Sequence, residues 1–356
     1  MRLLISVGGV AFSTTLILLL IGLYQGVNHL LGLYVEKVGA DVWVAQPGAS
    51  DFTGTASFLP ATVENDLRRV PGVTSVTPFY GRRSSLEVNG KALATFLAGF
   101  DEEHTAAGPI NMVSGKRFPA QGEIIIDEVF AKINDLSIGD TIGVLGEPHQ
   151  IVGISSGGNM FLLQYSFFSY EEASKTLVPQ GLVNFFLVHT EDGKAQPVMD
   201  AINERRMGAE GLLASRVIKN NKEIIEKSFL PIIFILTVIG FFIGSAVVAI
   251  TIYSATIERA REYGIIKALG APSSFLYSAV FQQSLISGAL GYLAGVGLMY
   301  LISWAVELYI PQFVTDVSWV EMTGTALAVG CMCVVASYLP ISRINRIDPA
   351  VVFKAS

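Results

Sequence analysis

Four long apolar runs dominate this sequence of 356 residues and limit the folds open to it. Each run reaches the roughly 20 residues that an α-helix needs to cross about 30 Å of hydrocarbon. Their central parts carry no Lys, Arg, Asp or Glu, and Glu321 stands only at the start of the last run. We therefore predict four membrane-spanning helices, at about Leu3–Leu33, Phe229–Ser254, Phe275–Ala305 and Val320–Ile341.

The composition favours a membrane protein over a wholly soluble one, since hydrophobic residues make up 51% of the chain and charged residues only 15%. The first run exceeds the apolar core of about 7–15 residues found in a usual signal peptide. We expect a retained helix, and a cleaved signal is the alternative. Cys331 and Cys333 stand two positions apart in the last run, where a helix points them to different faces, so we expect no disulfide.

Basic residues in the connections predict the orientation, because cytoplasmic loops carry an excess of Lys and Arg. The connection between the third and fourth runs, at about 306–319, has no Lys or Arg. We therefore expect both termini inside, residues 38–225 outside, and a multi-pass protein of the plasma membrane, which is the inner membrane in a Gram-negative cell. The basic residues lie after the second run and in the tail, at Arg259, Arg261, Lys267, Arg343, Arg346 and Lys354.

The long segment outside the membrane, residues 38–222, has the mixed strand and helix pattern of an α+β domain. Asn89-Gly90 between β-forming residues predicts a hairpin. Residues 122–156 predict a strand, a short helix and two strands around a turn at Gly146. Thr62 is a predicted N-cap of a short helix, and a further helix is expected over 195–208.

The predicted organisation has three parts. The first transmembrane helix occupies residues 1–37, the extracytoplasmic domain 38–222, and a region with three more spans 223–356. Residues 216–231 place apolar positions among charges and contain little Gly or Ser, which predicts a rigid helical stalk into the second span.

A short charged segment, "ATIERAREYGIIKALGAP", lies between the second and third runs. Read as a helix, it places Ile265 and Leu269 on one face, one turn apart. Gly270, followed by Ala271-Pro272, ends the helix. Periodicity alone also allows an ordinary cytoplasmic connecting helix.

The segment "ERAREYGIIKALGAPSSFLYSAVFQQSLI" resembles the signature of the FtsX-like permease domain, the membrane subunit of MacB-like ABC transporters. The tail "SRINRIDPAVVFKA" resembles the family's ending, and "LPATVENDLRRVPGVTSVTPF" the opening of its extracytoplasmic core domain. "LIGLYQG" and "GADVWVAQPG" resemble the DevC-like branch. Many relatives begin with a short amphipathic helix before the first span. This chain starts almost directly with the span, so that helix is absent or the start is truncated.

The resemblance implies that the short charged segment, at about 256–270, is a coupling helix that docks on an ABC ATPase. The fold implied is four transmembrane helices with an α+β domain between the first and second. The family also implies a second permease copy, as a homo- or heterodimer, and in some cases a periplasmic adaptor. The residues expected at the ATPase interface are Glu258, Arg259, Glu262, Tyr263, Lys267, Leu269 and Gly270.

Motifs for catalysis and metal binding are missing from the sequence. No G-x-x-x-x-G-K-[ST] loop occurs, so we expect ATP and Mg²⁺ to be bound by a separate ATPase subunit and not by this chain. The four histidines have no metal-ligand spacing, and Asp101-Glu102-Glu103 is interpreted as a solvated turn. We expect no catalytic residue, no metal or cofactor site and no nucleic-acid partner. Membrane lipids are the expected surroundings.

Small residues spaced by four form stripes in three of the runs and permit close helix packing in lipid. We interpret those in the first two spans as a dimer seam, and the stripe in the third span as packing within the chain. The residues are Gly22, Gly26, Gly240 and Gly244 in the first two spans, and Ser287, Gly291 and Gly295 in the third.

The main functional hypothesis is a permease that couples ATPase closure to extrusion of a lipid, lipoprotein, amphipathic peptide or drug. A different class is a non-transporting regulator that relays the same motion to an extracytoplasmic cell-wall hydrolase. A haem exporter and a sensor subunit are further alternatives. The sequence does not choose the substrate.

Overall fold

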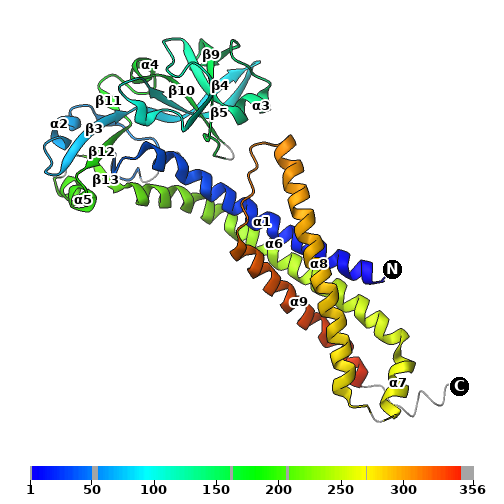
Figure 1. The fold of residues 1–356 in the computed structure, drawn as a ribbon. Helices are drawn as coiled ribbons and strands as arrows, with labels where there is room; N and C mark the ends of the chain where they lie inside the picture. Colours follow the sequence, from blue (N-terminus) through cyan, green and yellow to red (C-terminus); the bar gives the residue numbers. More distant parts are fainter. Residues whose placement is uncertain (1, 50–54, 161–162, 206–207, 270, 346–356) are drawn as a thin grey trace. The chain divides into compact units, whose positions relative to one another are not determined.

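The computed structural model describes the chain except for residues 1, 50–54, 161–162, 206–207, 270 and 346–356 (Figure 1). It consists of two compact units. The helical unit comprises Met1–Gly26, Ser228–Tyr309 and Val314–Ser356. The α+β unit comprises Val27–Lys227 together with Ile310–Phe313.

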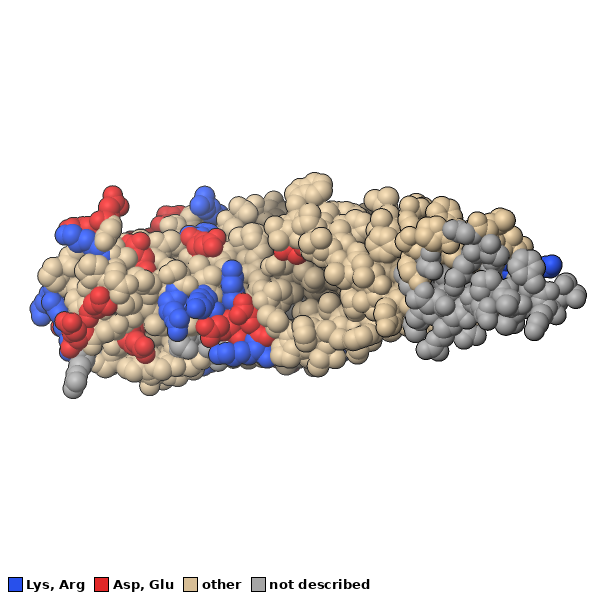
Figure 2. Space-filling model, turned by 90° about the horizontal axis from the view of Figure 1, so that it is seen from below, with Lys and Arg blue, Asp and Glu red and all other residues tan. Residues whose placement is uncertain are grey.

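Among the described residues, four helices are long and apolar enough to cross a membrane, which confirms the four predicted spans. Charged side chains gather on the α+β unit in Figure 2, and the surface of the long helices is almost free of them on the face drawn. The helices of the chain that contribute to the helical unit are α1 (Arg2–Val38), α6 (Ala214–Glu258), α7 (Ala260–Ala268), α8 (Ser273–Tyr309) and α9 (Trp319–Asn345).

The helical unit has an apolar core to which α1, α6, α8 and α9 all contribute. Val10, Val248 and Met332 are completely buried there. Many large apolar side chains point outward instead, such as Phe234, which is 64% exposed. In water this exposure would be unfavourable at about 25 cal/mol per Å² of apolar surface, whereas lipid removes that cost.

The α+β unit contains three sheets. Its four-stranded sheet has the order β13-β1-β12-β3, and β11 pairs with β2 in a separate ribbon. The strands of these two sheets are β1 (Val42–Ala45), β2 (Leu59–Pro60), β3 (Val73–Phe79), β11 (Leu182–Val183), β12 (Phe185–Thr190) and β13 (Glu210–Leu213). Helices α2 (Val63–Leu67) and α5 (Ala195–Glu204) share a hydrophobic core with the four-stranded sheet.

The larger sheet has the order β6-β9-β7-β10-β5-β4-β8, and β8 also pairs with β9, which closes it into a barrel. Its strands are β4 (Gly81–Val88), β5 (Lys91–Phe100), β6 (Asn111–Gly115), β7 (Glu123–Asp127), β8 (Thr141–Val144), β9 (Glu147–Ser156) and β10 (Gln164–Ser169). Its core also takes side chains from α3 (Glu128–Asn134) and α4 (Tyr170–Thr176). The short turn η1 (Thr105–Ala107) follows β5.

The predicted hairpin is confirmed, since β4 and β5 pair in antiparallel register with Val88 opposite Lys91. Asn89 and Gly90 have φ angles of 51° and 75°, as a type I′ turn requires. The predicted strand, helix and strand pair over 122–156 are β7, α3, β8 and β9.

The predicted N-cap role of Thr62 is wrong. Its backbone is already helical, with φ −62° and ψ −24°, and its side chain makes no capping hydrogen bond. A cap residue normally has extended backbone angles, which aim its oxygen at the free amides of the first turn. Asp127, which sequence reasoning did not single out, caps α3 in this way by accepting a hydrogen bond from the Val129 amide (2.9 Å).

The predicted stalk is present as part of one continuous helix. Helix α6 begins at Ala214, directly after β13, and continues without a break to Glu258. Its 45 residues exceed the roughly 20 that cross a bilayer. The same helix therefore supplies both the exit from the α+β unit and the second span.

Candidate functional site

The short helix α7 lies between the second and third spans, where the sequence predicted a coupling helix. It is separated from α6 at Arg259, so residues 256–258 of the expected coupling helix belong to α6. The Tyr263 amide donates to the Arg259 carbonyl (3.0 Å), and the Leu269 amide to the Ile265 carbonyl (3.0 Å). These backbone hydrogen bonds hold a rigid element of about two turns.

One side of α7 is anchored to the helical unit. Tyr263 and Ile266 are partly buried and pack against the apolar core that includes Leu276 and Val280 of α8. These two positions are three residues apart, so they lie on the same side of a helix. The anchoring fixes how α7 is oriented on the helices beside it.

An apolar and exposed pair lies beside this anchor, formed by Ile265 in α7 and Leu269, the residue that follows its last position. Ile265 is 42% exposed and Leu269 is 83% exposed. They are four residues apart and form a short apolar ridge, here called the α7 ridge. An exposed apolar ridge beside the anchored side chains of a short helix is the geometry by which such a helix fills a groove in a partner.

Charged side chains surround the α7 ridge. Glu258, Arg259, Arg261 and Glu262 are all exposed. Such charges at the rim of a contact favour specificity and correct orientation more than raw affinity. Lys267 lies in α7, but its side chain is outside the described part, as is Gly270.

The glycines of the first span pack against their own chain in this structure. A Cβ at Gly22 would stand 2.6 Å from a methyl of Val317, and one at Gly26 would overlap the Val314 carbonyl oxygen. The Asp316 amide also donates to the Gly22 carbonyl (3.0 Å). The connection that leads into α9 thus packs against Gly22 and Gly26 within this chain.

The glycines of the second span also face their own chain. A Cβ at Gly244 would stand 2.6 Å from the Ser13 hydroxyl oxygen, and one at Gly240 would stand 3.3 Å from Leu16. The physical reason is that α1 and α6 pack closely, as the hydrogen bond from Ser6 to Thr251 (2.6 Å) also shows. Gly240 and Gly244 therefore pack within this chain, and the dimer seam stays a prediction.

The stripe of the third span packs against α1. A Cβ at Gly291 would stand 2.5 Å from the Val10 Cβ, and one at Gly295 would stand 2.6 Å from the Thr14 Cβ. Thr15 donates its hydroxyl to the Gly295 carbonyl (3.0 Å), and Ser287 is buried. These contacts agree with the expectation of packing within the chain.

Within the described residues, no group of three or more His, Cys, Asp or Glu side chains is placed to hold a metal ion. Asp101, interpreted from the sequence as part of a solvated turn, accepts hydrogen bonds from the Glu103 and His104 amides. Its carboxylate stabilises a turn.

The sequence pattern predicts the α7 ridge, but it does not indicate which side chains anchor α7 to the helical unit. Tyr263 was singled out as part of an interface motif, whereas its side chain packs inward, and Ile266 was not singled out. The spacing of 263 and 266, three residues apart, was the available signal that these two side chains share one side of the helix. No local sequence pattern indicates that residues 314–317 pack against Gly22 and Gly26.

The architecture defines a class of protein: a multi-span membrane protein with a mixed extramembrane unit after its first span and a short, exposed helix between two later spans. The model of the MacB-like periplasmic core domain matches residues 3–205, and the model of the FtsX-like permease C-terminal region matches residues 229–349. This chain belongs to the MacB/FtsX type of ABC transporter permease.

Relatives of this type include fused and separate permeases. A probable export ATP-binding/permease protein of Pseudomonas fluorescens is 22% identical over 98% of this chain and 57% of its own length. This chain therefore spans little more than half of that relative. An uncharacterized ABC transporter permease of Mycobacterium bovis is 23% identical over 97% of this chain and 93% of its own length.

Among solved structures, the periplasmic region of MacB from Actinobacillus actinomycetemcomitans aligns with 52% of this chain and 94% of its own length. The identity is 14% and the TM-score 0.38.

Proposed function

We propose that this chain is the permease subunit of an ATP-driven exporter, in which a separate ABC ATPase binds the α7 ridge. The observation that carries the proposal is the exposure of Ile265 and Leu269 beside Tyr263 and Ile266, which anchor α7 to the helical unit. ATP and Mg²⁺ are bound by the ATPase, and this chain performs no catalytic step.

Helix α6 joins α7 to the α+β unit along the chain. Helix α7 follows α6 after the single residue Arg259, and α6 follows the last strand of the α+β unit without a loop. A continuous helix transmits displacement better than a flexible linker does. ATP-driven movement of α7 therefore has a direct covalent route to the extramembrane unit.

The proposed setting is the plasma membrane, with both termini and α7 in the cytoplasm and the α+β unit outside. A second permease copy, as a homo- or heterodimer, completes the transporter, and a periplasmic adaptor joins it where an outer membrane must be crossed. Relatives named as export proteins support export over regulation of a cell-wall hydrolase. The proposed cargo is a lipid, lipoprotein, amphipathic peptide or drug.

ATPase binding is tested by replacing Leu269 with Asp. An unpaired charge buried in an apolar groove costs several kcal/mol, and about 1.4 kcal/mol changes an affinity tenfold. We expect the ABC ATPase that co-purifies with the wild-type chain from its host cells to fall at least about tenfold with Leu269→Asp. Quantitative mass spectrometry of the purified complex measures this ratio.

The matched control is Leu145→Asp, which makes the same chemical change at an exposed leucine of the α+β unit. Leu145 is 39% exposed and has a φ of 53°, a conformation that Asp tolerates well. This variant should retain the ATPase. Normal ATPase recovery with Leu269→Asp would show that α7 is only a connecting helix.

A further inference from the structure

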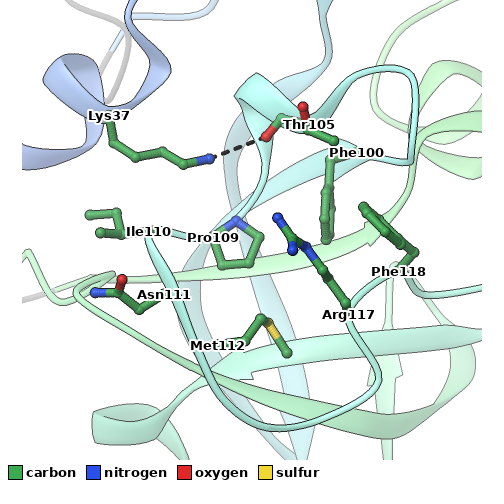
Figure 3. Close-up of a pocket in the computed structure, with 9 residues that line it drawn as sticks. All are labelled: Lys37, Phe100, Thr105, Pro109, Ile110, Asn111, Met112, Arg117 and Phe118. Carbon is green, nitrogen blue, oxygen red and sulfur yellow. Dashed lines mark hydrogen bonds between the residues drawn. The ribbon is translucent and has the colours of Figure 1, made fainter.

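A pocket of about 250 Å³ lies in the α+β unit, where the end of α1 meets the turn η1 and the strand β6 (Figure 3). Nothing in the coupling mechanism uses it. Its walls combine two cationic side chains with apolar and aromatic ones. The lining residues central to its chemistry are Lys37, Phe100, Ile110, Met112, Arg117 and Phe118.

Lys37 contributes a positive charge held in place by hydrogen bonds, although burial and the nearby Arg117 lower the pKa of its ammonium from 10.5 to about 8. Its ammonium donates hydrogen bonds to the carbonyls of Thr105 (3.2 Å), Ala106 (3.2 Å) and Gly108 (3.0 Å). All three of its donors are therefore used, and all of its acceptors are neutral. The side chain is held rigidly, and its charge is not neutralised by any of these contacts.

Arg117 contributes a second positive charge on the same pocket. Its guanidinium carbon lies 5.5 Å from the centre of the Phe118 ring. In Figure 3 the guanidinium points into the space between Phe100 and Pro109. An arginine of this kind offers planar N–H donors to an oxyanion in a forked geometry.

Within the described residues, neither cation forms an ion pair, although other cations of the same unit do. Lys116, Lys175 and Lys194 each pair with a glutamate. Two cations on one pocket repel each other unless an anion lies between them. The hydrogen bonds from Lys37 to the turn explain why Lys37 lies at the pocket. They do not explain why Arg117 also lies at the pocket.

The apolar residues of the pocket restrict the class of ligand that it can bind. Phe100 is 2% exposed, and Ile110, Met112 and Phe118 are partly buried around it. Free inorganic phosphate would gain nothing from these groups. A ligand with an oxyanion next to an alkyl chain would satisfy both the cations and the apolar wall.

We propose that this pocket binds the phosphate group of an anionic amphiphile, with Arg117 as the hydrogen-bond donor, Lys37 as the fixed charge and Phe100, Met112 and Phe118 against the alkyl chain. The bound phosphate lies between the two cations and removes their mutual repulsion. The site is separate from the α7 ridge, and binding does not require an ATPase.

The test is a binding titration on the full-length chain in nanodiscs of zwitterionic phosphatidylcholine, without any ATPase. The probes are dodecyl phosphate below its micelle concentration, inorganic phosphate and uncharged dodecanol. We expect saturable binding of dodecyl phosphate, and at least about tenfold weaker binding of the other two. Because no ATPase is present, this result and the docking of α7 can fail independently.

Variants then assign the site. Arg117→Gln should weaken dodecyl phosphate binding at least about tenfold, as expected when a charge-assisted hydrogen bond is lost. Arg117→Lys should retain part of the affinity, because it keeps the charge but not the forked donors. Arg69→Gln, just after α2, is the matched control, since Arg69 is exposed and does not line the pocket. Arg117 is exposed as well, so these changes leave the fold intact.

Three results would overturn the proposal. The first is the absence of saturable binding of dodecyl phosphate. The second is equal affinity for inorganic phosphate, which would make the site one for free phosphate. The third is an affinity that Arg117→Gln leaves unchanged or that Arg69→Gln lowers equally, which would place the amphiphile elsewhere on the chain.

Discussion

At the scale of single residues, Asp127 shows how one side chain can serve the fold at an energetic cost. Its carboxylate accepts hydrogen bonds from the Val129 amide (2.9 Å) at the start of α3 and from the Gly158 amide (2.9 Å). Burial raises the pKa of Asp127 from 3.8 to about 6, although these two hydrogen bonds act in the opposite direction. The charged form is therefore penalised in the folded state.

This pKa shift predicts a pH-dependent stability. Above pH 6 the folded state bears the full penalty of the buried charge. As the pH falls from about 6 to about 4, the folded state binds a proton that the unfolded state does not, so stability rises. The contribution is at most about 3 kcal/mol, at about 1.36 kcal/mol per pKa unit. Asp127→Asn should remove this rise, in addition to a constant loss of one hydrogen bond, because the Asn side-chain nitrogen cannot accept from the second amide.

The measurement is urea unfolding of the α+β unit in the full-length chain, followed by Trp43 fluorescence. The other two tryptophans, Trp304 and Trp319, are replaced by Phe for this purpose. Asp66→Asn on α2 serves as the matched control, because it removes an exposed carboxyl. Parallel pH profiles for wild type and Asp127→Asn would contradict the prediction.

At the scale of elements, the contact between α1 and α8 depends on the absence of a side chain at Gly295. A Cβ there would stand 2.6 Å from the Thr14 Cβ and 2.8 Å from the Ala11 carbonyl oxygen. Relief of such overlap needs movement of the backbone, and overpacking costs about 1–3 kcal/mol. Gly295→Ala should therefore lower the thermal unfolding midpoint of the chain in detergent.

Gly297 provides the control on the same helix. A Cβ at Gly297 would meet nothing within 4 Å. Gly297→Ala should leave the midpoint unchanged or raise it slightly, because alanine favours helix by up to about 1 kcal/mol over glycine. Equal midpoints for the two variants would show that α1 and α8 are not in close contact.

The elements that the sequence predicted are those with strong local signals. The four spans follow from long apolar runs, and the β4–β5 hairpin follows from Asn89-Gly90, whose positive φ angles suit few other pairs. Closure of the barrel also requires β8 to pair with β4, where Val144 lies opposite Leu86, and these strands are distant in the chain. Such pairings depend on tertiary contacts and leave no periodic pattern in the sequence.

The part of the candidate site that was predictable from the sequence is likewise the part that follows from a local pattern. The repeat of Ile265 and Leu269 is local, and both side chains are exposed as a docking face requires. The glycine stripes were less informative, because a small-residue stripe specifies close packing without specifying the partner. The segment 314–317, almost 300 residues along the chain, covers Gly22 and Gly26.

At the scale of the whole molecule, the proposed orientation places Asn89 outside the cell and Glu262 inside. Both side chains are exposed. With Cys331 and Cys333 replaced by serine, single cysteines at these two positions report their side of the membrane. We expect a membrane-impermeant maleimide to label the Asn89→Cys chain in intact cells, and the Glu262→Cys chain only after lysis. Labelling of Glu262→Cys in intact cells would contradict the orientation.

The central claim is that ATP bound by a separate ATPase moves the extramembrane unit through α7 and α6. Hydrogen exchange of the assembled complex in nanodiscs tests this most directly, because it reports on residues 214–227 of α6 without labels. We predict that ATP with vanadate changes exchange in this segment relative to the nucleotide-free complex. Leu145→Asp should respond as wild type does, and Leu269→Asp should not respond. Exchange that is identical in both nucleotide states of the wild-type complex, or an equal response in Leu269→Asp, would contradict the account.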